Sequence, residues 1–171
     1  MKEIINNKDN IQENEVTDLV KKVKVLLFNS NNEILLAHQY NGYEFPGGTH
    51  EEGEELKDTV KREIIEETGI KLDTSKLLPF ACSISYYKDW PAKGRNKKIE
   101  IYYYEVKTNE KPNLDNINLT EKEKNGDFKL QYIVFDELEK LIKSTIELTN
   151  DPRGIGREML QLIEIYKKIK E

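Results

Sequence analysis

Three glutamates with helical spacing are the residues of this chain best suited to chemistry: Glu63, Glu66 and Glu67. Side chains three and four positions apart are neighbours on a helix, so these carboxylates gather within about one turn. An apolar stripe of Leu56, Val60 and Ile64 predicts that helix and should face the core. Repulsion on an exposed helix is only about 0.2–0.5 kcal/mol per like-charged pair, so the cluster alone establishes no function.

The loop before this helix is rich in glycine. Gly47, Gly48 and Gly53 allow left-handed backbone conformations and a close approach of the backbone to a ligand. A backbone carbonyl is a ligand for hard cations. Several carboxylates with one carbonyl suit Mg²⁺ or Mn²⁺, which commonly bridge to substrate phosphates. Loop and helix together therefore indicate a metal site for phosphate chemistry.

The run from Gly48 to Ile70 resembles the Nudix box, which is Gly, five residues, Glu, seven residues, Arg-Glu, an aliphatic residue, any residue, Glu-Glu, any residue, Gly and an aliphatic residue. Every defined position matches, at Gly48, Glu54, Arg62, Glu63, Ile64, Glu66, Glu67, Gly69 and Ile70. A solvated helix rich in Lys and Glu is the alternative, but it leaves the loop glycines and Arg62 unexplained.

The resemblance implies a fold and an activity. The fold would be α/β, a Nudix-type α/β/α sandwich around a mixed β-sheet, in a single domain over residues 1–171. The activity would be hydrolysis of a nucleoside diphosphate linked to some other group. Divalent ions would activate water and neutralise charge on the phosphate oxygens.

The resemblance also implies roles for individual residues. The ligands of Mg²⁺ or Mn²⁺ would be the Gly47 carbonyl and the carboxylates of Glu63, Glu66 and Glu67. Arg62 would pair with Glu54, because a guanidinium is a rigid pair of donors that holds one carboxylate orientation. The candidate catalytic residues are thus Glu54, Arg62, Glu63, Glu66 and Glu67. The base would be a box glutamate or an acid on a distant loop, where the candidates are Glu121, Glu123 and Asp127.

The remaining chain predicts further elements. We expect strands near residues 19–28, 33–39, 78–87, 99–106 and 130–135. The runs at 78–87 and 99–106 should pair. Residues 1–15 read as a loosely attached extension or a short edge element, and the polar stretch 107–127 as a long loop that closes over a site.

Two helices are expected near the C-terminus. Asp136 should N-cap a helix over 137–143, and Asn150 should cap a helix opened by Pro152 within 151–171. The apolar face of this last helix would be core or a homodimer contact.

Substrate markers are sparse. Tyr86 or Tyr87 matches a tyrosine found in diadenosine polyphosphate hydrolases, whereas the proline typical of enzymes that cleave ADP-ribose is missing from that neighbourhood. Arg95 and its neighbouring lysines favour extra phosphates, and Trp90, Tyr102 and Tyr104 are candidates for stacking on a base. The candidate substrate-binding residues are Tyr86, Tyr87, Arg95, Glu121 and Glu123.

We therefore expect a small nucleotide with three or more phosphates as substrate. The alternatives are an ADP-ribose or nucleotide-sugar pyrophosphatase, a non-catalytic nucleotide sensor, and an RNA 5′-end processing enzyme. A basic trail for RNA is absent from the sequence. His50, inside the glycine-rich loop, is either solvated or in contact with a phosphate.

The composition of the chain limits the kinds of partner that we expect. A net charge of −5 provides no general attraction to nucleic acid or to anionic membranes. The single cysteine, Cys82, excludes an intramolecular disulfide and sits among apolar residues, so we expect a core thiol. Neither a membrane-spanning run nor a signal-peptide pattern is evident, and we expect a cytoplasmic protein.

Overall fold

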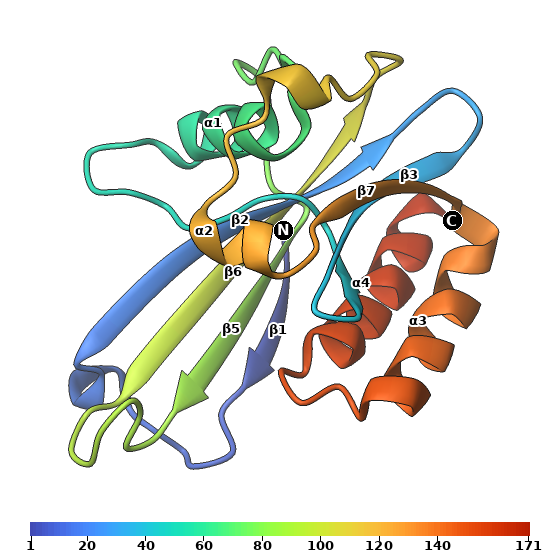
Figure 1. Ribbon diagram of the computed structural model, residues 1–171. Coiled ribbons are helices and arrows are strands. Elements are labelled where there is room, and N and C mark those ends of the chain that lie inside the picture. Colours follow the sequence, from blue (N-terminus) through green and yellow to red (C-terminus); the bar gives the residue numbers. More distant parts are fainter.

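The computed structural model describes the backbone of residues 1–171 and every side chain except those of Asn116 and Lys122. The described strands are β1 Lys2–Asn6, β2 Asp18–Phe28, β3 Glu33–Gln39, β4 Gly42–Glu44, β5 Ala81–Tyr87, β6 Lys97–Lys107 and β7 Lys129–Val134. The described α-helices are α1 Leu56–Thr68, α2 Glu121–Asn125, α3 Phe135–Thr149 and α4 Ile155–Lys170, and short 3₁₀ turns cover Glu13–Glu15 and Leu114–Asn116. Figure 1 shows their arrangement.

The strands form one mixed seven-stranded sheet in the order β1-β5-β6-β2-β3-β4, and β7 also pairs with β3, from Glu33↔Val134 to His38↔Lys129. The two long strands β2 and β6 run parallel along their whole lengths, from Asp18↔Lys97 to Phe28↔Lys107. β5 and β6 are antiparallel, which confirms the predicted pairing of these runs. β1 lies parallel to β5, so Lys2–Asn6 form a short edge strand, which is one of the two alternatives expected for the N-terminal segment.

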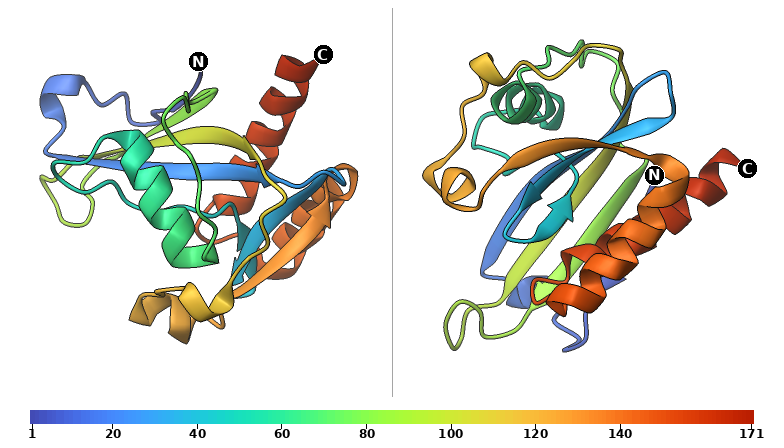
Figure 2. Two further views of the ribbon diagram at one scale, coloured as in Figure 1. Left: turned by 90° about the horizontal axis from the view of Figure 1, so that it is seen from above. Right: turned by 45° about the vertical axis from the view of Figure 1, so that its right-hand side comes forward.

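Alternation along β2 divides the core into two layers. Val23, Val25 and Leu27 face α1 and pack with its stripe residues Val60 and Ile64, all fully buried. This confirms the helix and the direction of its apolar face. The views of Figures 1 and 2 show α1 on one face of the sheet and the α3–α4 pair on the other. The expected α/β sandwich is confirmed.

The second layer lies beneath α3 and α4. Leu26 and Phe28 of β2 pack there with Leu138 and Leu162. The apolar face predicted for the last helix, including Met159, Leu162, Ile163 and Tyr166, is buried in this layer and is therefore core. Cys82 is also buried, as predicted. No helix among the described residues has the length and apolarity to cross a membrane.

The predicted boundaries of α3 and α4 were wrong. α3 covers Phe135–Thr149, because β7 passes directly into it and Phe135 packs against Phe28 with 5.2 Å between ring centroids. Asp136 therefore lies in the first turn and is not the N-cap. Asn150 adopts a left-handed conformation, φ 58°, that ends α3 instead of starting α4.

Asp151 caps the start of α4. Its carboxylate oxygens accept hydrogen bonds from the backbone N–H groups of Gly156 and Arg157, both at 3.0 Å. The helix begins at Ile155, after Gly154, so Pro152 lies in the preceding turn. The N-cap residue of α4 is Gly154, so the predicted cap at Asn150 was wrong. The neighbouring Asp151 accepts the hydrogen bonds of the first turn instead, and sequence alone does not separate the two because Asn and Asp are equally suited to capping.

Candidate active site

The glycine-rich loop is paired with the backbone of β2. Val25 N–H donates to Pro46 O at 2.9 Å, Val23 N–H to Gly48 O at 3.0 Å, and His50 N–H to Lys21 O at 2.9 Å. A Cβ on Gly47 would overlap the carbonyl oxygen of Val23, and φ is +131°. Glycine is therefore required where the loop lies against β2.

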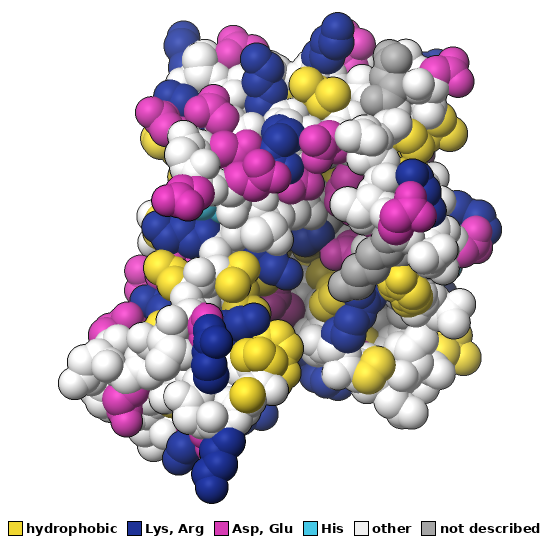
Figure 3. All heavy atoms as spheres, turned by 60° about the vertical axis from the view of Figure 1, so that its left-hand side comes forward, with side chains coloured by type: hydrophobic (Ala, Val, Ile, Leu, Met, Phe, Trp, Pro, Cys, Tyr) yellow, Lys and Arg dark blue, Asp and Glu magenta, His cyan; other side chains and the backbone are white. Residues whose placement is uncertain are grey.

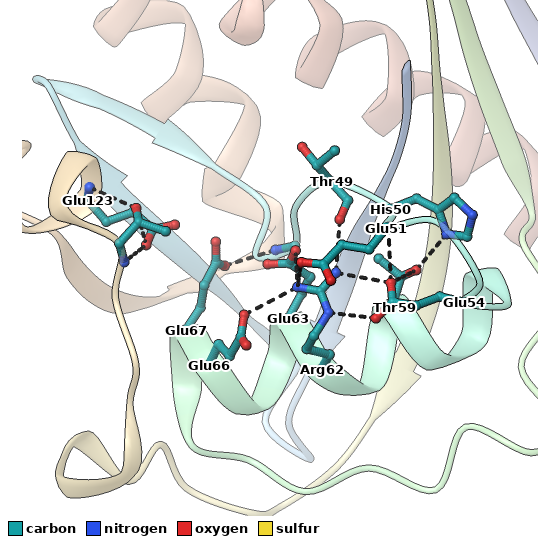
Figure 4. A network of polar contacts seen from close by, with 12 residues as sticks. Thr49, His50, Glu51, Glu54, Thr59, Arg62, Glu63, Glu66, Glu67 and Glu123 are labelled. Carbon is teal, nitrogen blue, oxygen red and sulfur yellow. Dashed lines mark hydrogen bonds and ion pairs between the residues drawn. The ribbon is translucent and has the colours of Figure 1, made fainter. Parts of the chain in front are cut away.

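Two box carboxylates reach this loop from α1. The N–H of Gly47 donates to Glu67 Oε2 at 2.9 Å, in a buried contact. The Glu63 carboxylate lies so close to Gly48 that a Cβ there would overlap it. The bare backbone of the two glycines thus makes room for the carboxylates, and Figure 4 shows the box side chains on the loop-facing side of α1.

Arg62 joins the loop to the helix. Its Nε and Nη2 donate to the two carboxylate oxygens of Glu54 at 2.7 and 3.1 Å. Nη2 also donates to Thr49 O at 2.9 Å, and Nη1 donates to Glu63 Oε1 at 2.8 Å and to Glu66 Oε2 at 3.3 Å. This is the pairing with Glu54 that the box resemblance implies, extended to two of the clustered glutamates (Figure 4).

His50 belongs to the same network. Its Nδ1 lies 2.9 Å from Thr59 Oγ1, and that hydroxyl donates to Glu54 Oε2 at 2.8 Å. Thr59 is fully buried. The ring of His50 therefore fastens the loop to the start of α1, in addition to any contact that it makes with a ligand.

The structure adds two residues that the sequence reasoning missed. Lys24 Nζ donates to Gly47 O and to Glu44 Oε2, both at 2.8 Å, and Gln39 donates to the other oxygen of Glu44. The available signal was the position of Lys24 within β2, on the same strand face as the core residues Leu26 and Phe28. A lysine at a core-facing position needs a buried partner.

Burial and charge shift the carboxyl groups in different directions. Burial raises the pKa of Glu67 to about 8, although Lys24 and the Gly47 N–H oppose it. Burial also raises the pKa of Glu63, with Arg62 acting against it. The hydrogen bonds from Arg62 lower the pKa of Glu54 to about 2. Arg62 and Glu54 thus form a pair that stays charged at neutral pH, which we call the clamp. Glu63 and Glu67 are buried carboxyl groups whose ionised forms a nearby cation would stabilise.

Lys24 and Glu44, the two residues that the sequence reasoning missed, are both charged. Burial would lower the pKa of Lys24, but the negative charges of Glu44 and Glu67 raise it overall. Burial would raise the pKa of Glu44, but Lys24 and Gln39 bring it down to about 2. Both groups are therefore charged at neutral pH, next to the glycine-rich loop.

The long segment after β6 returns to α1. Asn113 N–H donates to Thr68 O at 2.9 Å, and Asn118 N–H donates to Glu66 O at 2.7 Å. The Glu123 carboxylate accepts from the backbone N–H and hydroxyl of Thr120, at 2.6 and 2.8 Å. Figure 4 shows Glu123 on the side of the cluster nearest Glu67.

The three acids of this segment differ in their surroundings. The charge of Glu123 contributes to the raised pKa of Glu67. Glu121 instead pairs with Lys124 at 3.0 Å, and Asp127 pairs with Lys129 at 2.7 Å. Glu123 is thus the acid of this group that is coupled electrostatically to the cluster.

The other candidate substrate contacts lie elsewhere. The hydroxyl of Tyr86 donates to Glu13, and Tyr87 lies next to Trp90, with ring centroids 6.0 Å apart. Arg95 donates to both carboxylate oxygens of Asp18. Asp18 precedes Lys24 by six positions of β2, a distance of about 20 Å along a strand. The structure does not bring these residues to the glutamate cluster.

The stacking candidates on β6 are also engaged in the protein. Tyr104 is buried in the layer beneath α1, so it offers no surface for a base. Tyr102 donates its hydroxyl to Glu100 at 2.9 Å. Trp90 remains half-exposed, with Lys97 Nζ 4.0 Å from its ring centroid, at the far end of the β5–β6 hairpin.

The donors at the loop are those of a hard cation: carboxylates and one backbone carbonyl. In the part of the chain that the structure describes, no three acidic, His or Cys side chains surround a common point as metal ligands do. Arg62 and Lys24 lie among the carboxylates instead. By donor type the residues fit Mg²⁺ or Mn²⁺, and the gap at Gly48 gives the Glu63 carboxylate room beside the loop.

The structure thus joins an acidic helix to a glycine-rich loop beside a mixed sheet, an arrangement of oxygen donors suited to the chemistry of phosphate compounds. The model of the NUDIX domain matches residues 18–149, and the chain belongs to this family. It is therefore a Nudix hydrolase, an enzyme that acts on phosphoanhydride bonds.

Solved structures share the fold. A MutT protein from Methanosarcina mazei Go1 is 17% identical, with a TM-score of 0.55 over 88% of this chain and 96% of that one. A complex of the C. elegans Ap4A hydrolase is 19% identical, with a TM-score of 0.52 over 88% of this chain and 96% of that one.

One relative is similar in sequence over a short stretch. Mouse nucleoside diphosphate-linked moiety X motif 6 is 42% identical over 55 residues, which are 32% of this chain and 16% of that protein.

Proposed function

We propose that this Nudix hydrolase cleaves a phosphoanhydride bond in a nucleotide that carries three or more phosphates. The observation that carries the proposal is the meeting of two box carboxylates with the glycine-rich loop. Glu67 accepts from Gly47 N–H at 2.9 Å, and the Glu63 carboxylate occupies the space left by the missing side chain of Gly48. Oxygen donors from helix and loop thus face one another.

Mg²⁺ or Mn²⁺ would be held by the Gly47 carbonyl and by Glu63, Glu66 and Glu67. Such an ion, when bound, lowers the pKa of a water and neutralises charge on phosphate oxygens. Arg62 keeps Glu63 and Glu66 turned toward the loop, because its guanidinium is fixed by two hydrogen bonds to Glu54.

Glu66 and Glu123 are our two candidates for the residue that takes the proton of the attacking water. The Glu66 side chain is 34% exposed, compared with 11% for Glu63, so it is the more accessible of these two. Glu123 lies on the segment whose backbone is hydrogen-bonded to α1, and its charge acts on Glu67. Glu66 is also a proposed metal ligand, so replacing Glu123 by glutamine is the variant that separates the two candidates. The kcat should fall by at least about 10²-fold if Glu123 is the base and stay near that of the wild type if Glu66 is.

A preference for several phosphates is supported by the surroundings of the loop. Figure 3 shows acidic side chains gathered around a basic one, and beneath them a hollow lined partly by basic and apolar side chains. Lys24 lies at the loop, and the charge of Arg153 acts on neighbouring Glu44. The MutT and Ap4A hydrolase structures share this fold, but at identities of 17% and 19% the similarity concerns the fold alone.

The test is a panel of substrates incubated with the purified protein and Mg²⁺. It contains nucleoside triphosphates, dinucleoside polyphosphates, ADP-ribose, nucleotide sugars and triphosphorylated RNA. We expect the highest kcat/KM among the first two classes. A preference for ADP-ribose or a nucleotide sugar would refute the substrate class, and binding without cleavage of any compound would indicate a sensor.

A matched pair of variants connects activity to the site. Glu66→Gln removes one carboxylate of the cluster, and Glu52→Gln removes the same charge from an exposed position of the loop. We expect only the first substitution to abolish the cleavage seen with the preferred substrate. Equal loss in both would mean that activity follows net charge and not the proposed ligands.

A further inference from the structure

Lys24 is a mostly buried cation whose partners belong to the site. Its side chain is 15% exposed and that of its partner Glu44 is 12% exposed. The ammonium group donates at 2.8 Å both to Glu44 and to the carbonyl oxygen of Gly47. A buried charge persists only where partners compensate its lost hydration, so both contacts are integral to the folded protein.

Lys24 is not needed to direct the Gly47 carbonyl. The residues on either side, Pro46 and Gly48, already accept hydrogen bonds from the backbone of β2 at 2.9 and 3.0 Å. The N–H of Gly47 is held by Glu67. The backbone around Gly47 is therefore fixed without Lys24. What the lysine adds is a positive charge and a hydrogen bond to the carbonyl oxygen that a metal ion would also bind.

That charge acts on the carboxylates that are proposed to hold the metal. The positive charge of Lys24 opposes the burial effect at both Glu67 and Glu63. Its ammonium group therefore already provides part of the compensation that a divalent ion would provide. Two cations so close to one carbonyl oxygen repel each other in a partly desolvated site.

We propose that Lys24 is a tethered cation that competes with the divalent ion for the Gly47 carbonyl oxygen and thereby sets the affinity of the metal site. The inference rests on the proposed function, because it concerns the same ligands. Its consequence is that protein alone holds the ion weakly. A polyphosphate that neutralises both cations makes ion and substrate bind cooperatively.

The decisive measurement is Mn²⁺ affinity without substrate, by calorimetry, for the wild type and three variants. Lys24→Met removes the cation. Lys24→Met combined with Glu44→Gln also removes its partner, so that an unpaired Glu44 cannot attract the ion. Lys57→Met, on the exposed side of α1, is the control for net charge.

We expect Mn²⁺ to bind the single and the double variant at least about threefold more tightly than the wild type, with Lys57→Met unchanged. A double variant that binds Mn²⁺ no more tightly than the wild type overturns the role of Lys24. A wild type that takes up no Mn²⁺, with or without nucleotide, refutes the proposed function itself. The two failures are therefore distinguishable.

A second measurement needs no variant of altered stability. The ammonium signal of Lys24 can be followed by NMR in ¹³C,¹⁵N-lysine-labelled wild-type protein, and Lys24→Arg serves to assign it. Saturation with Mg²⁺ should shift this signal, because the ammonium group gives up or shares the Gly47 carbonyl. An unshifted signal in protein that demonstrably binds Mg²⁺ would also overturn the proposal.

Discussion

Replacing Arg62 by methionine should destabilise the protein by about 2 kcal/mol. Arg62 is 24% exposed, and its partners Glu54 and Glu63 are 19% and 11% exposed. Breaking a buried pair costs about 3–5 kcal/mol and a surface pair contributes about 0–1, so this partly buried clamp belongs between those limits. For a chain of this size the loss corresponds to a fall in Tm of about 4–8 °C.

The assay is thermal unfolding in the presence of a chelator, so that only contacts within the protein count. Arg95→Met is the matched control, because Arg95 also donates to both oxygens of one carboxylate, that of Asp18, but its side chain is 54% exposed. We expect a Tm change at least twice as large for Arg62→Met as for Arg95→Met. Equal shifts would refute the reasoning that partial burial strengthens the clamp.

The same variant should change the acid dependence of stability. The pKa of Glu54 is lowered in the folded protein, from 4.5 to about 2. A depressed carboxyl pKa contributes stability above the unfolded value, and that contribution is lost as pH falls from about 4.5 toward 2. Arg62→Met should therefore lose less stability than the wild type between about pH 5 and pH 3. Parallel curves would contradict this.

Three further outcomes follow from the site. Glu66→Gln should lower Mg²⁺-dependent kcat at least ~10²-fold, the range for loss of a base or ligand, and steady-state kinetics near wild type would contradict its role. Gly48→Ala should lower kcat by about 10²-fold, because a Cβ displaces the Glu63 carboxylate. Gly42→Ala should leave kcat unchanged, because the nearest atom to its Cβ is at an ordinary 3.7 Å. Burial raises the pKa of Glu67 in the folded protein to about 8. In metal-free protein the free energy of unfolding should therefore fall as pH rises from about 4.5 to 8, because the folded state holds this proton more tightly than the unfolded state. Glu67→Gln should flatten this slope in denaturant titrations.

The features that the sequence predicted correctly are local. The stripe of Leu56, Val60 and Ile64 predicts α1 and its buried face, because helical periodicity depends only on residues that are close in sequence. The pairing of Arg62 with Glu54 spans eight residues and follows from the box. The pattern of strands likewise followed from β-branched and aromatic runs bounded by turn residues.

The errors arose where tertiary packing decides. A capping residue was sought at Asp136, but the contact of Phe135 with Phe28 starts α3 earlier, directly at the end of β7. The polar segment after β6 was expected to be a loop throughout, but it contains the short helix α2. Its attachment to α1, through backbone hydrogen bonds to Thr68 and Glu66, was not predicted. Its partners are too distant in sequence for periodicity to reveal them.

The missed pair of Lys24 and Glu44 shows how the site depends on β2. One side of this strand packs α1 through residues such as Val25, its backbone binds the glycine-rich loop, and its other side carries Lys24. A single strand therefore positions the loop that carries the Gly47 carbonyl against α1, and it also supplies the cation that donates to this carbonyl. Because side chains alternate along a strand, a one-residue shift of β2 would exchange Lys24 for an apolar neighbour and remove the charge from the site.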